Sequence, residues 1–362
     1  MRDRTSSSGG GEGEVGYGCL HSTTLVNLNR VWYFLWREIS KSEPEGSLVV
    51  SSPTPVVLLG FNRPDLTHIV FQAIRAAKPK RLFLVMDGPR NGVPGEEQLV
   101  QETRRVVSTV DWTCEVTRIY SETNLGLKRR ISSGLDEVFS QVDSAIILED
   151  DCVPHPTFFD FAGEMLQRYL ADSQVGIVSG SSRLRGHRAS PYSYDFSADI
   201  RIWGWATWAR TWNLFRESGD LEASWSPSQR ESIIAAIPQG PRRTSMKKML
   251  ERSLNLDSWA LPFVVHCQKQ GYLNIVPEVN LVENIGFGAR STHTKFEDFV
   301  SQVPTTAMIF PLRHPSSVTL NIRLDALESR LDAKEWWLYP LLHPIDVTLR
   351  ALRFLRLRLT EK

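Results

Sequence analysis

The stretch SAIILEDDC, residues 144–152, decides the fold of this chain. The apolar run at 145–148 is typical of a buried parallel strand, and the acid triplet Glu149, Asp150 and Asp151 follows it directly. Ligands of open α/β sheets bind at the carboxyl ends of strands. Three adjacent carboxylates repel one another unless a cation lies among them, and Mg²⁺ and Mn²⁺ prefer oxygen ligands. The stretch alone leaves two interpretations open, a divalent cation site and a solvated acidic turn.

Strand and helix patterns alternate on both sides of this stretch. Strands are predicted at 56–61, 81–86, 114–120, 145–148 and 175–179, and helices at 64–77, 95–108, 125–141 and 156–170. Such alternation indicates βαβ crossovers, so we predict an α/β fold with a mainly parallel sheet and helices on both faces. Residues 183–225 are predicted to be irregular. Beyond them, helices are predicted at 227–237, 243–253 and 257–270, and a short strand at 273–276.

Composition describes an ordinary globular protein. The chain has 362 residues, of which 41% are apolar and 23% charged, and its formal net charge of +1 argues against bulk binding of nucleic acid. No run approaches the ~18 apolar residues of a membrane span, and no signal-peptide pattern opens the chain, so a cytoplasmic location is expected. Four cysteines lie far apart, which predicts separate reduced thiols and no zinc site.

The chain divides into three parts by composition. Residues 1–46 predict a flexible extension with a short helix at about 25–39, 47–300 are expected to form one globular α/β domain, and 301–362 a helical tail. Strand and helix patterns alternate in the first half of that domain, 55–182, but not in the second, 183–300. The basic, leucine-rich segment 346–359 has two interpretations, a peripheral contact with the inner face of a membrane and packing on its own domain.

Several polar residues follow predicted strands and therefore gather at one edge of the sheet. They are Asn62, Arg63, Asp87, Lys128 and Arg129, and the acid triplet lies with them. Each one alone is more often a surface cation or a turn residue. Together they combine carboxylates for a divalent cation with cations for phosphate, which predicts a site for a nucleotide diphosphate.

Three common motifs are missing from the sequence. There is no GxGxxG after the first strand, no GxxxxGK[ST] and no GxSxG. Dinucleotide-dependent, P-loop and acyl-hydrolase functions therefore lose their main support.

Residues 55–161 resemble nucleotide-sugar glycosyltransferases of the GT-A fold, in the order of their motifs. These are NRP at 62–64, MDG at 86–88, NLG at 124–126 and LEDD at 148–151. The acid triplet is similar to the Glu-Asp-Asp form of that fold's Asp-x-Asp motif, known from the N-acetylglucosaminyltransferase I group, and the chain also looks family 2-like. The resemblance extends over roughly 55–295 and is weakest between 183 and 250. It implies a GT-A-like glycosyltransferase domain at 47–300, with a donor half at 55–182 and an acceptor half at 183–300.

The resemblance implies a role for each residue at this edge. Arg63 and Asp87 would contact the nucleotide, with Asp87 receiving the uracil or ribose, and Lys128 or Arg129 would approach the base or phosphates. Asp151 would bind Mn²⁺ or Mg²⁺ directly, and the other two acids would hold sugar and ribose hydroxyls. A metal there would neutralise the charge that develops on the departing diphosphate.

Two later residues are candidates for chemistry. The resemblance places an acid directly before Trp259 as the base that deprotonates the acceptor; this chain has Ser258 there, so Asp257 is the candidate. Asp257 could instead cap a helix N-terminus. His293 follows a glycine-rich loop, where it is either a structural histidine or a metal or diphosphate ligand.

Tryptophans are concentrated between 203 and 212. They either pack in the core or form an aromatic wall for a sugar ring, and the candidates for that wall are Trp203, Trp205 and Trp259. Gly204 could let a ligand approach the backbone between the first two.

The predicted function is inverting, metal-dependent transfer of a sugar from a nucleotide-diphosphate donor, most simply a UDP-sugar, to a hydroxyl of a glycan or glycoconjugate. One alternative is a nucleotidyltransferase that makes nucleotide sugars, although the Gly-rich, Arg-Lys loop of that class is missing. The other is an inactive sugar- or nucleotide-binding protein on the same fold, which the departure at Ser258 would favour.

Overall fold

The computed structural model describes residues 53–222, 225–236, 243, 246–247, 250–251, 258–286, 303–342 and 344. All of them belong to one compact unit, Ser51–Lys362. The predictions for the extension 1–46, for Asp257, for His293 and for the basic segment 346–359 therefore lie outside the described residues.

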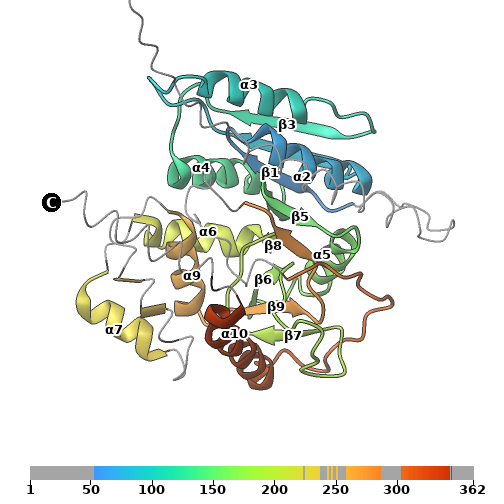
Figure 1. Cartoon of the computed structure of the whole chain (residues 1–362), viewed down its shortest axis with the longest axis vertical. Coiled ribbons are helices and arrows are strands. Elements are labelled where there is room, and N and C mark those ends of the chain that lie inside the picture. The colour runs from blue at the N-terminus through green and yellow to red at the C-terminus, as the bar shows by residue number, and fades with distance from the viewer. Residues whose placement is uncertain are drawn as a thin grey trace, which may run out of the picture. The chain divides into compact units, whose positions relative to one another are not determined.

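One mixed sheet organises the fold (Figure 1), and its strand order is β3-β2-β1-β4-β8-β6-β9-β7. In that order the strands are β3 (Glu115–Tyr120), β2 (Arg81–Met86), β1 (Val56–Gly60), β4 (Ser144–Glu149), β8 (Trp205–Trp208), β6 (Val175–Ser179), β9 (Leu273–Pro277) and β7 (Tyr194–Ser197). The first four run parallel to one another, and β6 runs parallel to β9. Within this sheet, β8 runs antiparallel to β4 and β6, and β7 runs antiparallel to β9. The predicted α/β class with a mostly parallel sheet is confirmed.

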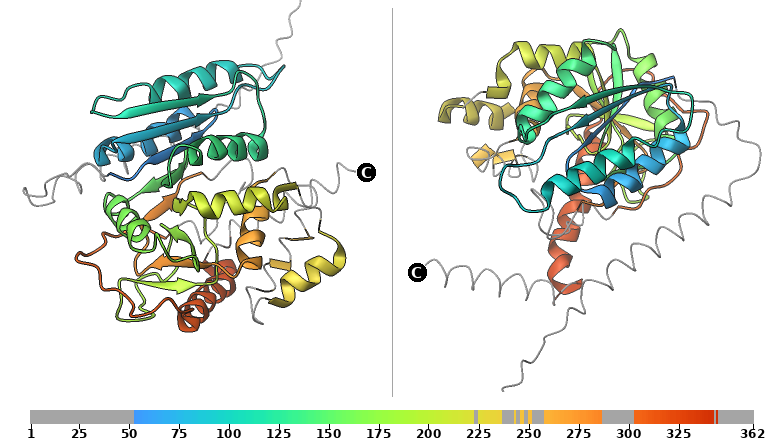
Figure 2. Two further views of the ribbon diagram at one scale, coloured as in Figure 1. Left: turned by 180° about the vertical axis from the view of Figure 1, so that it is seen from behind. Right: turned by 90° about the horizontal axis from the view of Figure 1, so that it is seen from above.

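Helices cover both faces of the sheet (Figures 1 and 2). One face packs on α2 (Pro64–Ala77), α3 (Glu96–Val107) and α5 (Thr157–Arg168), and the other packs on α4 (Leu127–Phe139), α6 (Ala209–Glu217) and α9 (Ala260–Lys269). Strand β1 shows why both faces are covered. Val56 and Leu58 pack in the core on the side of α2, α3 and α5, and Val57 and Leu59 pack in the core on the side of α4, α6 and α9. Alternate side chains point to opposite faces, so a strand that is buried on both faces reads as a continuous apolar run.

The prediction that 183–225 is irregular is wrong. This range contains β7, β8, α6 and the short 3₁₀ helix η1 (Asp220–Glu222). Strand β8 lies between β4 and β6 and has all four of its residues buried. It was missed because a four-residue strand buried on both faces shows no alternation, and its tryptophans suggested a ligand-binding wall instead.

The later chain packs onto this sheet. A second, two-stranded sheet pairs β5 (Cys152–Pro154) with β10 (Val282–Asn284). Helices α7 (Pro227–Ala236) and α10 (Ile322–Leu342) complete the described elements, and 243, 246–247 and 250–251 are helical within the predicted 243–253 helix. The amide of Ser193 donates to the carbonyl of Arg313 at 2.9 Å, which ties the segment before α10 to the β7 side of the sheet.

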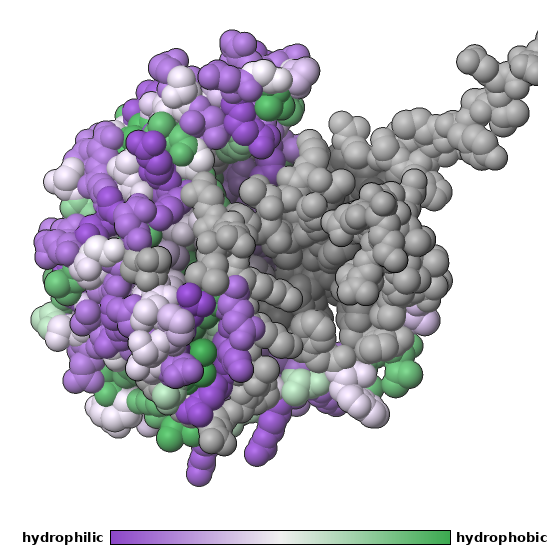
Figure 3. Space-filling view, turned by 90° about the vertical axis from the view of Figure 1, so that its left-hand side faces the viewer, coloured by the Kyte–Doolittle hydropathy of each residue, from purple (hydrophilic) through white to green (hydrophobic). Residues whose placement is uncertain are grey.

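Other composition-based predictions can be compared with the described residues. Cys114, Cys152 and Cys267 are free thiols, as predicted. No helix in the described part of the chain has the length and apolar character needed to cross a bilayer. The face shown in Figure 3 is mostly hydrophilic, with apolar residues scattered over its coloured part.

Candidate functional site

The carboxyl ends of β1, β2 and β4 meet at one edge of the sheet. Gly60 pairs with Met86, and Leu59 pairs with Glu149, so the three strands end level with one another. Arg63 and the acid triplet are therefore brought together as the sequence predicts. We call this part of the molecule the acid edge.

Arg63 neutralises the last two acids of the triplet. Its Nε lies 3.1 Å from Oδ2 of Asp150, and its Nη1 lies 2.9 Å from Oδ2 of Asp151. Burial alone would lower the pKa of Arg63, but the charges of the two aspartates more than offset it and hold that pKa above its usual range. The arginine is fully charged and held in a fixed position between the carboxylates.

One guanidinium does not balance three carboxylates. Burial raises the pKa of Glu149, and the neighbouring charges of Asp151 and Asp150 raise it further, against the effect of Arg63. Burial also raises the pKa of Asp150, although Arg63 opposes that rise. The acid edge therefore holds excess negative charge, and a bound cation would relieve it.

The donor set for a metal is only partly described. Within the described ranges, no three His, Cys, Asp or Glu side chains are grouped closely enough to hold an ion. Asp151 supplies the hard oxygen that Mn²⁺ or Mg²⁺ prefers. Asp151 is therefore the candidate ligand among the described residues, and His293 lies outside them.

A glycine brings another segment against Asp151. The amide of Ile285 donates to the carbonyl of Asp151 at 2.8 Å, directly after the pairing of β10 with β5. A Cβ on the next residue, Gly286, would lie 2.0 Å from Oδ2 of Asp151. Only glycine lets the chain pass so close to this carboxylate.

Asp87 holds a loop together and does not present a free carboxylate. Its oxygens accept hydrogen bonds from the amides of Gly88 (2.9 Å), Leu125 (2.9 Å) and Gly126 (3.1 Å) and from Nδ2 of Asn124 (3.1 Å). A carboxylate has about four acceptor positions, and these are filled. Burial raises the pKa of Asp87, while the three amides oppose that rise. We call this arrangement the Asp87 clasp, because it fastens the end of β2 to the turn before α4.

The other polar residues predicted for this edge are engaged with protein groups or lie at the surface. Nδ2 of Asn62 donates to Glu96 at 3.0 Å, and Nζ of Lys128 lies 2.7 Å from Glu222. Arg129 is exposed on α4. The hydrogen bond of Asn62 and the ion pair of Lys128 are thus made with residues outside the acid triplet.

Sequence reasoning missed Arg130, the next residue along α4. It is 7% exposed, and its Nε has no hydrogen-bond partner. Burial lowers its pKa, and the charge of Asp87 acts against that effect. Arg130 shares the inward helical face of Gly134, where a Cβ would lie 3.1 Å from Nη2 of Arg130, and only the packing of α4 reveals which face is inward.

Most of the predicted aromatic wall belongs to the core. Trp205 and Trp259 are 1% and 2% exposed, and their rings stack with centroids 5.8 Å apart. The predicted sugar-binding role of these two residues is wrong, and the packing interpretation is confirmed. Trp203 is only partly buried and lies two residues before Trp205, which pairs with Ile147 near the end of β4.

Gly204 permits the close approach of another segment of the protein. A Cβ there would lie 2.5 Å from Cγ1 of Val282, and its φ of 58° also favours glycine. The expectation that a ligand approaches this glycine is wrong, because Val282 of β10 fills the space.

Helix α9 begins close to the candidate base. Its N-cap residue is Trp259, and the amide of Ala260 donates to Oγ of Ser258 at 3.3 Å. Asp257 lies outside the described residues, so both of its expected roles, base and helix cap, stay predictions.

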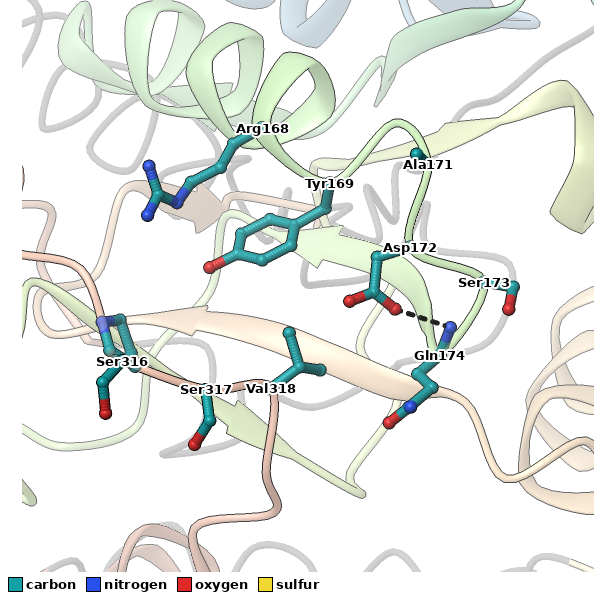
Figure 4. A pocket seen from close by; sticks show the side chains of 10 residues that line it. Arg168, Tyr169, Ala171, Asp172, Ser173, Gln174, Ser316, Ser317 and Val318 are labelled. Atoms are coloured by element: carbon teal, nitrogen blue, oxygen red, sulfur yellow. Dashed lines mark hydrogen bonds between the residues drawn. The ribbon is translucent and has the colours of Figure 1, made fainter.

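Two cavities lined by described residues lie away from the acid edge. The one in Figure 4 measures about 610 Å³ and lies beside the start of β6, with Arg168, Tyr169 and Gln174 in its wall. The other measures about 1010 Å³ and lies where β2 and β3 begin, near Lys80 and Glu115. Both are at the amino ends of parallel strands, opposite the edge where ligands bind in such sheets.

Comparison with known proteins leaves the function open. No family model and no curated protein matches the chain. Among solved structures it is similar to UDP-glucose pyrophosphorylase complexed with UDP-glucose, at 8% identity over 60% of this chain and 98% of that chain, with a TM-score of 0.26. It is equally similar, at 10% identity with the same coverage and TM-score, to 4-diphosphocytidyl-2C-methyl-D-erythritol synthase from Anaerococcus prevotii and to inositol-1-phosphate CTP transferase from T. maritima. Scores this low assign no function, and the fold class rests on the sheet described above.

Proposed function

We propose that this protein is an inverting, metal-dependent glycosyltransferase that uses a nucleotide-diphosphate sugar, with UDP as the simplest nucleotide. The observation that carries the proposal is the pairing of Arg63 with Asp150 and Asp151 where β1 and β4 end. The edge combines a fixed cation for phosphate with excess carboxylate for a divalent cation. Both are needed to hold a diphosphate.

The proposal gives separate roles to the residues of this edge. Asp151 would bind Mn²⁺ or Mg²⁺, which supplies Lewis-acid assistance to the departing diphosphate. Glu149 and Asp150 would accept hydrogen bonds from hydroxyl groups of the sugar and ribose. Arg63 would bind phosphate oxygens through the N–H groups that its contacts with Asp150 and Asp151 leave free.

Arg130 is the second cation available to the donor. Its guanidinium lies beside the Asp87 clasp with an unsatisfied Nε, so a nucleotide oxygen there would supply a missing acceptor. Asp87 itself would act indirectly, by fixing the turn that opens α4. This assignment replaces the direct nucleotide contact expected from the sequence.

Inverting transfer also needs a base for the acceptor hydroxyl, and Asp257 is proposed for it. Trp203 would offer an indole face to a sugar ring, since it alone of the three candidate tryptophans is only partly buried. The acceptor class proposed is a glycan or glycoconjugate.

A calorimetric titration with UDP, with and without Mn²⁺, tests the proposal. Binding that depends on Mn²⁺ is expected, and it should be lost in Asp151→Ala but kept in Glu97→Ala, an exposed acid on α3. Absence of UDP binding under both conditions would overturn the proposal.

A screen of nucleotide sugars then distinguishes the reactions. Release of UDP with transfer to an acceptor supports glycosyl transfer, and release of pyrophosphate from UTP and a sugar phosphate supports the nucleotidyltransferase alternative. UDP binding without turnover supports an inactive binding protein. Full transfer activity in Asp257→Asn would exclude Asp257 as the base.

A further inference from the structure

Ion pairs fix the rotation of α10 on the protein. Its inner face carries Glu328, which is 1% exposed and accepts a hydrogen bond from Nη1 of Arg201 at 3.0 Å. One turn later, Asp332 lies 3.1 Å from Nη1 of Arg185. Residues four apart share a helical face, so these pairs determine which side of α10 faces the domain.

The opposite side of α10 carries Arg323, Arg330, Lys334, Trp337 and Leu341, which we call the outer stripe. All five are exposed, Trp337 by 74% and Leu341 by 69%. At 3.6 residues per turn they fall within a sector of about 60°. No ion pair joins the three cations to another residue in the described part of the chain, and the stripe contains no acid.

The order of residues along the stripe has chemical meaning. Three cations come first, and a tryptophan and a leucine follow in the last two turns. Cations on a helix are attracted to anionic lipid headgroups, and tryptophan is enriched at the depth where headgroups meet acyl chains. A partly apolar, basic helical face is typical of helices that lie on a membrane surface.

We propose that the outer stripe of α10 docks the protein on an anionic lipid bilayer. Figure 2 (right) shows α10 extending away from the sheet, so its last turns can reach a planar surface. The proposal does not depend on the reaction at the acid edge, which is formed by other elements.

The positive charge of the outer stripe favours a lipid surface over a segment of the same chain as its binding partner. Residues 345–362 follow α10 and contain Arg350, Arg353, Arg356 and Arg358, so they have the same sign as the stripe. Two cationic segments repel each other, whereas an anionic surface attracts both. The charge of the sequence beyond α10 therefore argues against that sequence as the occupant of the stripe.

Vesicle co-sedimentation of the full chain tests the proposal. We expect binding to phosphatidylcholine vesicles that contain about 30% phosphatidylserine, weakening as salt rises, and much weaker binding to phosphatidylcholine alone. Reversal of two charges, Arg330→Glu with Lys334→Glu, should weaken binding by about tenfold or more. Trp337→Ala should weaken it by about fivefold, even where salt screens the charges.

The control reverses two exposed cations elsewhere, Lys80→Glu with Arg105→Glu, and gives the same net charge. Vesicle binding should survive in this control, and thermal unfolding should show that all variants remain folded. Equal loss in the control and the stripe variant would indicate nonspecific attraction and overturn the proposal. If the folded full chain does not bind anionic vesicles, another occupant covers the stripe and the proposal also fails.

Discussion

Nη1 of Arg63 lies 2.9 Å from Oδ2 of Asp151, across the ends of two neighbouring parallel strands. The arginine therefore occupies the place beside Asp151 that a divalent cation would share. In the protein without ligands, this contact keeps excess negative charge at the acid edge from destabilising the fold.

Arg63→Ala should lower the free energy of unfolding of the metal-free protein by about 3 kcal/mol, because it leaves partly buried carboxylates unpaired. Mn²⁺ should then stabilise the variant more than it stabilises the wild type, since the ion replaces the missing positive charge. Urea unfolding with and without Mn²⁺ measures both effects.

Arg75→Ala is the matched control for that experiment. Its pair with Asp111 is exposed, so its loss should change the free energy of unfolding by less than about 1 kcal/mol, with no effect of Mn²⁺ on the difference. Equal stabilisation of wild type and Arg63→Ala by Mn²⁺ would show that the ion binds away from Asp151.

The Asp87 clasp gives a second prediction. Asp87→Asn keeps the shape of the side chain but replaces an acceptor oxygen with a donor that faces amide N–H groups. It should lower the free energy of unfolding by about 2 kcal/mol, measured by urea unfolding, while Glu97→Gln on exposed α3 should leave it unchanged. Unchanged stability together with lost UDP binding would instead support the direct nucleotide contact that the resemblance implied.

Much of the acid edge could be predicted from sequence because its geometry follows from topology. Parallel strands end level with one another, so residues directly after them, such as Arg63 and Asp151, must meet. The phase of a helix is harder to predict: of the adjacent cations Lys128, Arg129 and Arg130, only packing decides that the third faces inward.

Contacts between distant parts of the chain could not be predicted. Gly204 is a glycine because Val282 packs against it, and no local pattern joins residues 78 positions apart. The ion pair of Arg201 with Glu328 joins residues that are 127 positions apart. Local sequence therefore predicts which elements form and where a parallel sheet gathers its loops, whereas side-chain partners depend on the assembled fold.

The difference in burial between Trp259 and Trp203 gives a third prediction. Trp259→Ala removes a ring packed against Trp205 and Phe263, and should lower the free energy of unfolding by about 3–5 kcal/mol. Trp203→Ala should cost less stability because that residue is only partly buried, but it should weaken donor or acceptor binding. Thermal unfolding and calorimetry with a UDP-sugar separate these effects. A larger stability loss for Trp203→Ala would place it in the core with the others.

The buried pair of Arg201 with Glu328 predicts how stability changes with acid. Burial would raise the pKa of Glu328, but Arg201 and the amide and charge of Arg183 outweigh it, so this pKa lies below its ordinary value of 4.5. A carboxyl whose pKa is lower in the folded protein stabilises the fold above its unfolded-state pKa. That contribution is lost as the pH falls below about 4.5 and through the folded-state pKa.

Glu328→Gln should therefore flatten the dependence of unfolding free energy on pH below about 4.5, and should cost about 3 kcal/mol at neutral pH because Arg201 keeps its buried charge. Urea unfolding at a series of pH values measures both quantities. Glu97→Gln, at an exposed site, should reproduce the wild-type curve. If the free energy of unfolding of Glu328→Gln falls as steeply at low pH as that of the wild type, other carboxyls cause the acid sensitivity. That result would contradict the role of this pair.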